Sequence, residues 1–197
     1  MTRALIVIDV QNDFCPGGAL AVPDGDAVVA RINAMMESFD AVVLTQDWHP
    51  AGHSSFASSH PGKGPFEMVE MSYGAQVLWP DHCIQGSEGA AFHPGLRTDG
   101  DLILRKGFRK AIDSYSAFFE NDRSTPTGLE GYLRTRGIGE VVLAGLATDF
   151  CVNYSAVDAA RLGFGVSVAL EACRGIDMEG SVAAAEAGMR AAGVRLV

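Results

Sequence analysis

One apolar run ends in a thiol at Val141-Val142-Leu143-Ala144-Gly145-Leu146-Ala147-Thr148-Asp149-Phe150-Cys151. It has the composition of a buried strand until Gly145 interrupts it, and a helix is expected to start soon afterwards. Cys151 is therefore predicted in the first turn of a helix, just past the carboxyl end of a strand. Free backbone N–H groups and the helix dipole there favour a thiolate, which predicts a lowered pKa and a nucleophilic thiol. A small buried Cys at a helix start is the alternative for this residue taken alone.

Apolar runs rich in Val, Ile and Leu recur along the chain. They predict six strands, at 4–10, 41–45, 102–105, 140–144, 165–170 and 194–197. Such near-continuous apolar strands are typical of a parallel sheet covered on both faces. Helical patterns occupy 25–38, 127–136, 149–162 and 179–192, the third with a predicted cap at Thr148 and Asp149. We therefore expect an α/β fold, a doubly wound sheet of about six mainly parallel strands with helices on both faces.

Composition narrows the class of protein. The 197 residues are 48% hydrophobic, which suits one domain over 1–197, and no linker or repeat divides them. A net charge of −9 argues against nucleic acid or an anionic membrane as partner. The expected partner is a small-molecule substrate. The four cysteines show no C-x-x-C pairing, and the apolar start is too short for a secretory or membrane-spanning segment. We therefore expect reduced thiols in a cytoplasmic protein. The sequence leaves open whether the protein forms a homo-oligomer.

Two charged residues end other predicted strands. Asp9 follows the apolar run that begins the chain, and Lys106 follows the run at 102–105. Because the carboxyl ends of parallel strands meet at one edge of a sheet, we expect both side chains near Cys151. An acid, a base and a thiol at one edge predict a cysteine hydrolase.

A long insertion, residues 46–101, lacks periodic runs and is expected to be functional. It holds all five histidines, His49, His53, His60, His82 and His93. Asp47 and His49 lie at i and i+2 on an extended segment, so they point to the same side. His82 is the candidate third ligand, and Asp81 and Cys83 are left out of the set. One Asp and two His with open positions suit Zn²⁺, Fe²⁺ or Mn²⁺.

These residues resemble a known family. The carrying motifs are Asp9-Val10-Gln11-Asn12-Asp13-Phe14, Thr45-Gln46-Asp47-Trp48-His49-Pro50, Leu78-Trp79-Pro80-Asp81-His82-Cys83, Arg105-Lys106-Gly107-Phe108, Asp113-Ser114-Tyr115-Ser116-Ala117-Phe118 and Gly145 to Val152. Together they cover most of the chain. The sequence resembles the metal-bearing nicotinamidase branch of the isochorismatase-like cysteine hydrolases.

The resemblance implies roles for individual residues. It implies a catalytic triad of Cys151, Asp9 and Lys106, and metal ligands Asp47, His49 and His82. His53 ranks behind these ligands, because its spacing resembles that of members in which it lies outside the ligand set. The resemblance also implies a cis peptide bond at Leu146–Ala147 and an oxyanion hole from the N–H groups of Ala147 and Cys151. The expected walls of the substrate pocket are Phe14, Leu20, Trp79, Tyr115 and Phe150.

The implied reaction is hydrolysis of nicotinamide to nicotinate and ammonia through a Cys thioester. A divalent metal, Zn²⁺ first, would position the pyridine ring, pyrazinamide is a further expected substrate, and the implied role is NAD salvage. One rival is a metal-free relative that cleaves another amide or ureido bond, or an isochorismatase-type ether, which Asp47, His49 and His82 argue against. A metal-hydroxide amidase is another rival, and it would not need Cys151. A thiol redox protein or a nucleotide binder is weaker, since neither a resolving Cys nor G-x-G-x-x-G is seen.

Overall fold

A single parallel sheet organises the molecule, and the computed structural model describes residues 2–197 of it. Its strands are β1 (Thr2–Ile8), β2 (Ala41–Asp47), β5 (Leu102–Lys106), β6 (Ile138–Leu146), β7 (Gly165–Arg174) and β8 (Arg195–Leu196). They lie in the order β5-β2-β1-β6-β7-β8, and every neighbouring pair is parallel. The predicted α/β sheet of about six mainly parallel strands is confirmed.

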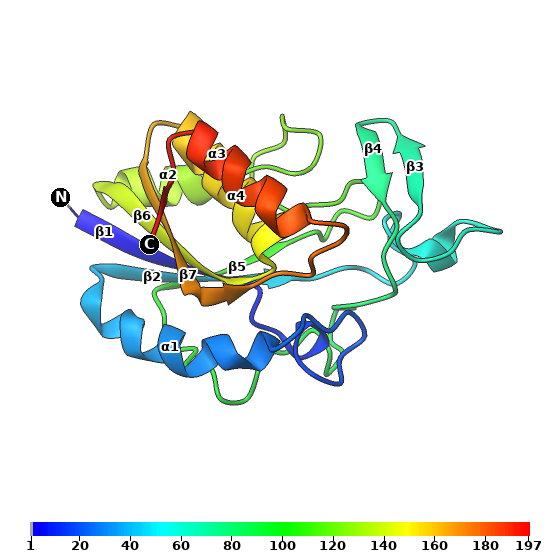
Figure 1. The fold of residues 1–197 in the computed structure, drawn as a ribbon, viewed down its shortest axis with the longest axis horizontal. Coiled ribbons are helices and arrows are strands. Elements are labelled where there is room, and N and C mark those ends of the chain that lie inside the picture. The colour runs from blue at the N-terminus through cyan, green and yellow to red at the C-terminus, as the bar shows by residue number, and fades with distance from the viewer. Residues whose placement is uncertain (1) are drawn as a thin grey trace.

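Helices cover both faces of this sheet, as predicted. Helix α1 (Val28–Met35) lies on one face, and α2 (Leu129–Thr135), α3 (Asn153–Arg161) and α4 (Ser181–Ala191) lie on the other (Figure 1). The central strand β1 is fully buried from Ala4 to Ile8, because side chains from both layers pack against it. None of the described helices has the length and apolar composition needed to span a bilayer.

The insertion contains a hairpin that the sequence analysis missed. Strands β3 (Met68–Met71) and β4 (Gly74–Val77) pair antiparallel and lie beyond the carboxyl ends of the parallel strands (Figure 1). The signal was weak because both strands are only four residues long and partly exposed. The hairpin brings Gln76, which is buried, toward the same edge of the sheet as Asp9 and Lys106.

The turn that carries the nucleophile candidate also differs from the prediction. Residues Thr148–Val152 form a π-helical turn, and α3 starts only at Asn153, so Cys151 precedes the α-helix. The Thr148/Asp149 cap is wrong as well, because the start of this turn has no side-chain cap and Asp149 bonds to another segment. The Leu146–Ala147 peptide bond is cis, as the resemblance implied.

Gly145 is needed where β6 passes β1 into this turn. Its φ is +127°, and a Cβ here would collide with the backbone of Ile8, including its carbonyl oxygen. We expect Gly145→Ala to lower the free energy of unfolding by at least about 2 kcal/mol, measured by denaturant titration. Gly139→Ala is the matched control, because it lies on the same strand with open space around the added Cβ. Equal stabilities of the two variants would contradict this reading of the turn.

Candidate active site and metal centre

Lys106 lies at the centre of the site. Its Nζ forms an ion pair with Asp9 Oδ2 at 2.8 Å, donates hydrogen bonds to Asp47 Oδ1 at 2.7 Å and to the Ser114 carbonyl at 2.8 Å, and lies 3.4 Å from Cys151 Sγ. Lys106 is 1% exposed, and Asp9 is fully buried. The sheet sets these distances, because Lys106 of β5 lies in register beside Asp47 of β2. The predicted meeting of Asp9, Lys106 and Cys151 therefore occurs at the carboxyl ends of the strands.

The carboxylate of Asp9 is held from a second side. Thr45 Oγ1 donates to Asp9 Oδ1 at 2.6 Å and accepts the N–H of Asp9 at 3.1 Å. Asp9 has a φ of +47°, a conformation that a non-glycine residue adopts at a cost. These bonds direct the carboxylate toward Lys106 and Cys151.

Charge balance in the site corrects the predicted thiolate. Burial raises the pKa of the Cys151 thiol well above its usual range, and the Lys106 ammonium opposes this without overcoming it. The same cation is shared by two carboxylates, and it holds the pKa of Asp47 well below its usual range against burial. Burial also raises the pKa of Asp9 despite Lys106. Burial and the nearby carboxylates of Asp9 and Asp47 therefore favour the protonated thiol of Cys151 over the thiolate.

Three metal-binding side chains converge beside the thiol. The ligand atoms of Asp47, His49 and His82 all lie within 4.8 Å of one another, and all three residues are buried. Asp47 Oδ2 lies 3.3 Å from His49 Nε2 and 3.7 Å from His82 Nε2. The sequence prediction of this set agrees with the geometry.

The hydrogen bonds of the two imidazoles test whether the set suits a cation. His49 Nδ1 donates to the Gly107 carbonyl at 2.9 Å, and His82 Nδ1 donates to the Pro80 carbonyl at 2.7 Å. Because a carbonyl only accepts, each Nδ1 carries the proton, and in the neutral ring Nε2 presents a lone pair. Two nitrogen lone pairs and a carboxylate oxygen thus face one another, which is the donor set of a divalent transition-metal site with ordered outer partners.

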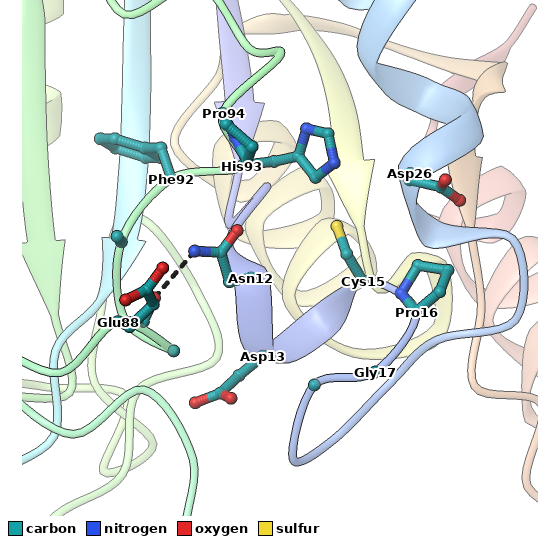
Figure 2. A pocket seen from close by; sticks show the side chains of 13 residues that line it. Asn12, Asp13, Cys15, Pro16, Gly17, Asp26, Glu88, Phe92, His93 and Pro94 are labelled. Atoms are coloured by element: carbon teal, nitrogen blue, oxygen red, sulfur yellow. Dashed lines mark hydrogen bonds between the residues drawn. The ribbon is translucent and has the colours of Figure 1, made fainter.

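The other histidines lie outside this set. The His53 ring packs against the His49 ring with the centroids 4.4 Å apart and the planes tilted by 40°, but its nitrogens bond to Ser55 Oγ and to the carbonyls of Arg109 and Ile112. His60 bonds to the Ser54 carbonyl. His93 lines a separate cavity of about 680 Å³, together with Cys15 and Asp26 (Figure 2). Burial, reinforced by Asp26, raises the pKa of Cys15 to about 11, so this thiol is a poor nucleophile at neutral pH.

A narrow pocket joins the thiol to the metal-binding side chains. Its walls include all five side chains expected from the resemblance, Phe14, Leu20, Trp79, Tyr115 and Phe150, and it also reaches Asp47, His82, Ala147 and Cys151. The Trp79 and Phe150 rings meet edge to face at 4.8 Å. An apolar pocket with rings on its walls and a thiol at one end suits a small planar aromatic substrate.

Sequence reasoning missed two residues of this pocket, Asp113 and Ile176. Asp113 lies inside a quoted motif, and its carboxylate accepts hydrogen bonds from Gln76 Nε2 at 2.9 Å and from the Ser114 N–H at 2.8 Å. Its place in that motif was the available signal. Ile176 follows β7 in a short loop without periodic patterning, so no signal pointed to it.

Comparison with known proteins identifies close relatives. Residues 3–197 match the isochorismatase domain. A nicotinamidase of Acinetobacter baylyi is 53% identical over 195 residues, which are 98% of this chain and 91% of that protein. The solved nicotinamidase/pyrazinamidase of Acinetobacter baumanii is 54% identical, with a TM-score of 0.98 over 100% of this chain and 95% of that one. The pyrazinamidase of Pyrococcus horikoshii, solved in complex with zinc, is 34% identical, with a TM-score of 0.80 over 100% and 99%.

Proposed function

The chain belongs to the isochorismatase domain family and hydrolyses nicotinamide to nicotinate and ammonia, and we propose that it does so through a thioester on Cys151. The observation that supports this route is the position of Lys106, whose Nζ touches Asp9 and lies 3.4 Å from Cys151 Sγ. The acid, the base and the nucleophile are thereby within reach of one substrate carbon.

Proton transfer starts the reaction. As the sulfur of Cys151 attacks the carboxamide carbon, its proton passes to Asp9, and Lys106 stabilises the developing thiolate. The carbonyl oxygen gains negative charge, which the N–H groups of Ala147 and Cys151 meet. Each such donor contributes a rate factor of about 10²–10³.

Asp9 then acts as acid and afterwards as base. It gives its proton to the departing nitrogen, the C–N bond breaks, and ammonia leaves a nicotinoyl thioester behind. Asp9 next takes a proton from water, whose oxygen attacks the thioester carbon. Breaking of the C–S bond releases nicotinic acid, which ionises to nicotinate, and Asp9 returns its proton to the sulfur of Cys151.

Asp47, His49 and His82 would hold a divalent ion, and we propose Zn²⁺, with Fe²⁺ and Mn²⁺ as alternatives. Such an ion supplies an open Lewis-acid position for the pyridine nitrogen of the substrate. The zinc complex of the Pyrococcus horikoshii pyrazinamidase supports this choice. Pyrazinamide has a similar ring and carboxamide, so we propose it as a second substrate. We also propose a role in NAD salvage and a cytoplasmic location.

An ammonia-release assay combined with elemental analysis of the same sample tests the function. We expect ammonia from nicotinamide and from pyrazinamide, and one equivalent of a divalent metal per chain. If the protein carries the metal but releases no ammonia from either amide, the assignment of the substrate is wrong. A metal-free protein with full activity would overturn the metal's role.

Asp9→Asn gives two expected results of opposite sign. Ammonia release should fall by about 10³-fold, because an amide cannot shuttle a proton. The pKa of Cys151 should fall, since the variant lacks an anion that raises it, so alkylation by iodoacetamide should set in at lower pH. Asp24→Asn, at an exposed carboxylate, is the control expected to change neither value. A loss of activity with an upward shift of the alkylation midpoint would contradict this charge balance.

A further inference from the structure

We propose that Asp149 is a positioning residue that sets one wall of the substrate pocket, by fixing the segment 175–181 and with it the side chain of Ile176. This inference rests on the proposed function, because its readout is the binding of nicotinamide. Asp149 lies two residues before Cys151 in the π-helical turn and is 5% exposed. The pocket is lined by its neighbours Phe150 and Cys151 and also by Ile176, which comes from a later segment of the chain.

Both carboxylate oxygens of Asp149 accept hydrogen bonds from this segment. Oδ1 accepts the N–H of Ile176 at 3.0 Å. Oδ2 accepts the N–H of Asp177 at 2.9 Å and the hydroxyl of Ser181 at 2.5 Å. Three donors converge on one buried carboxylate, and Ser181 is the first residue of α4, whose dipole favours an anion there. Asp149 thus joins the nucleophile turn to the segment that carries Ile176.

The segment adopts a backbone that needs such an anchor. Asp177 and Glu179 have φ values of +57° and +52°, and Gly180 has +86°. Left-handed conformations at non-glycine residues persist where surrounding contacts compensate their cost. At Gly175 an added Cβ would collide with Val182 and would lie 3.2 Å from Asp149 Oδ1, so the segment passes close to the carboxylate. The bonds to Asp149 therefore determine where Ile176 sits.

Asparagine at this position separates the role of the charge from that of the shape. An Asn side chain has the size of Asp, but one of its two terminal atoms is an NH₂ group. Either orientation of the amide places that donor against the N–H of Ile176 or against the donors of Asp177 and Ser181. Asp149→Asn should therefore release the segment without emptying the space.

A released segment lets Ile176 withdraw from the pocket, and binding should weaken more than chemistry. We expect Asp149→Asn to raise KM for nicotinamide about 10-fold and to change kcat by less than about 3-fold. The KM for 5-methylnicotinamide should rise less than the KM for nicotinamide, because withdrawal of Ile176 leaves more space for a substituted ring. The rate of Cys151 alkylation should stay within about 2-fold of wild type.

The experiment measures kcat and KM for both amides on folded protein, together with Cys151 alkylation. The variants are Asp149→Asn, Ile176→Ala and their combination. The control is Asp158→Asn, because this carboxylate lies on α3, the helix that directly follows the nucleophile turn. Loss of the Asp149 anchor and loss of the Ile176 side chain should be non-additive, because they affect the same wall. Wild-type enzyme runs in parallel, and if it released no ammonia the proposed function itself would fail.

An unchanged KM in folded Asp149→Asn would overturn the inference, as would additive effects in the double variant. A fall in kcat with altered alkylation at constant KM would also overturn it, because Asp149 would then act on the nucleophile. If Asp149→Asn does not fold, Ser181→Ala decides, since it removes one of the three bonds and leaves the carboxylate in place. We expect Ser181→Ala to raise KM about 3-fold, and no change would overturn the inference.

Discussion

Cys151→Ala is expected to lower ammonia release from nicotinamide by about 10⁴-fold or more, while the protein stays folded and keeps its metal. Cys151 is the thiol that lies within 3.4 Å of the Lys106 ammonium and lines the pocket. Alanine removes the sulfur without adding bulk, and Asp47, His49 and His82 remain in place. Steady-state ammonia release, circular dichroism and metal content of the same preparation measure these quantities.

The control for this variant is Cys15→Ala, which removes a buried thiol from the separate cavity and should leave kcat within about 2-fold of wild type. Substantial hydrolysis by folded, metal-loaded Cys151→Ala would favour the rival in which a metal-bound hydroxide attacks the amide.

His49→Ala is expected to raise KM for nicotinamide by about 100-fold and KM for benzamide by much less. Nicotinamide has a ring nitrogen that a metal ion can hold, and benzamide has none. Wild-type enzyme should therefore prefer nicotinamide, and the variant should lose most of that preference. His49 is chosen over Asp47 because Asp47 also accepts a hydrogen bond from Lys106, and its loss would disturb the catalytic cation.

His93→Ala is the matched control, because this imidazole lines the separate cavity (Figure 2). It should keep the metal and both KM values. If the ion only orders the insertion, His49→Ala should raise KM equally for nicotinamide and benzamide, and the variant should be less stable. Equal losses on folded protein would contradict the positioning of the ring.

The sequence predicted the sheet because apolar strands with polar ends leave a strong pattern. It predicted the proximity of Asp9, Lys106 and Cys151 for the same reason. Parallel strands end at one edge, so residues far apart in sequence are brought together by topology alone. The β3–β4 hairpin and the π-helical turn left no such pattern. Short, half-exposed strands lack clear alternation, and the turn depends on how β6 meets β1 at Gly145.

The pKa of Cys151 could not be predicted from its local sequence alone. A thiol near a helix start and a lysine predicts a thiolate, but burial, together with the carboxylates of Asp9 and Asp47, raises the pKa of Cys151 instead. Ile176 shows a second limit. It lines the pocket, and its N–H donates to Asp149, an interaction across 27 residues of sequence that no motif records.

The most direct test of the account is mass spectrometry of the enzyme after rapid acid quenching during turnover of nicotinamide. The account predicts a nicotinoyl group on the peptide that contains Cys151, which disappears as the substrate is exhausted. Cys15, Cys83 and Cys173 should stay unmodified, and Cys151→Ala should carry no adduct. Normal turnover with Cys151 unmodified at every quench time, together with retained activity in Cys151→Ala, would contradict the thioester.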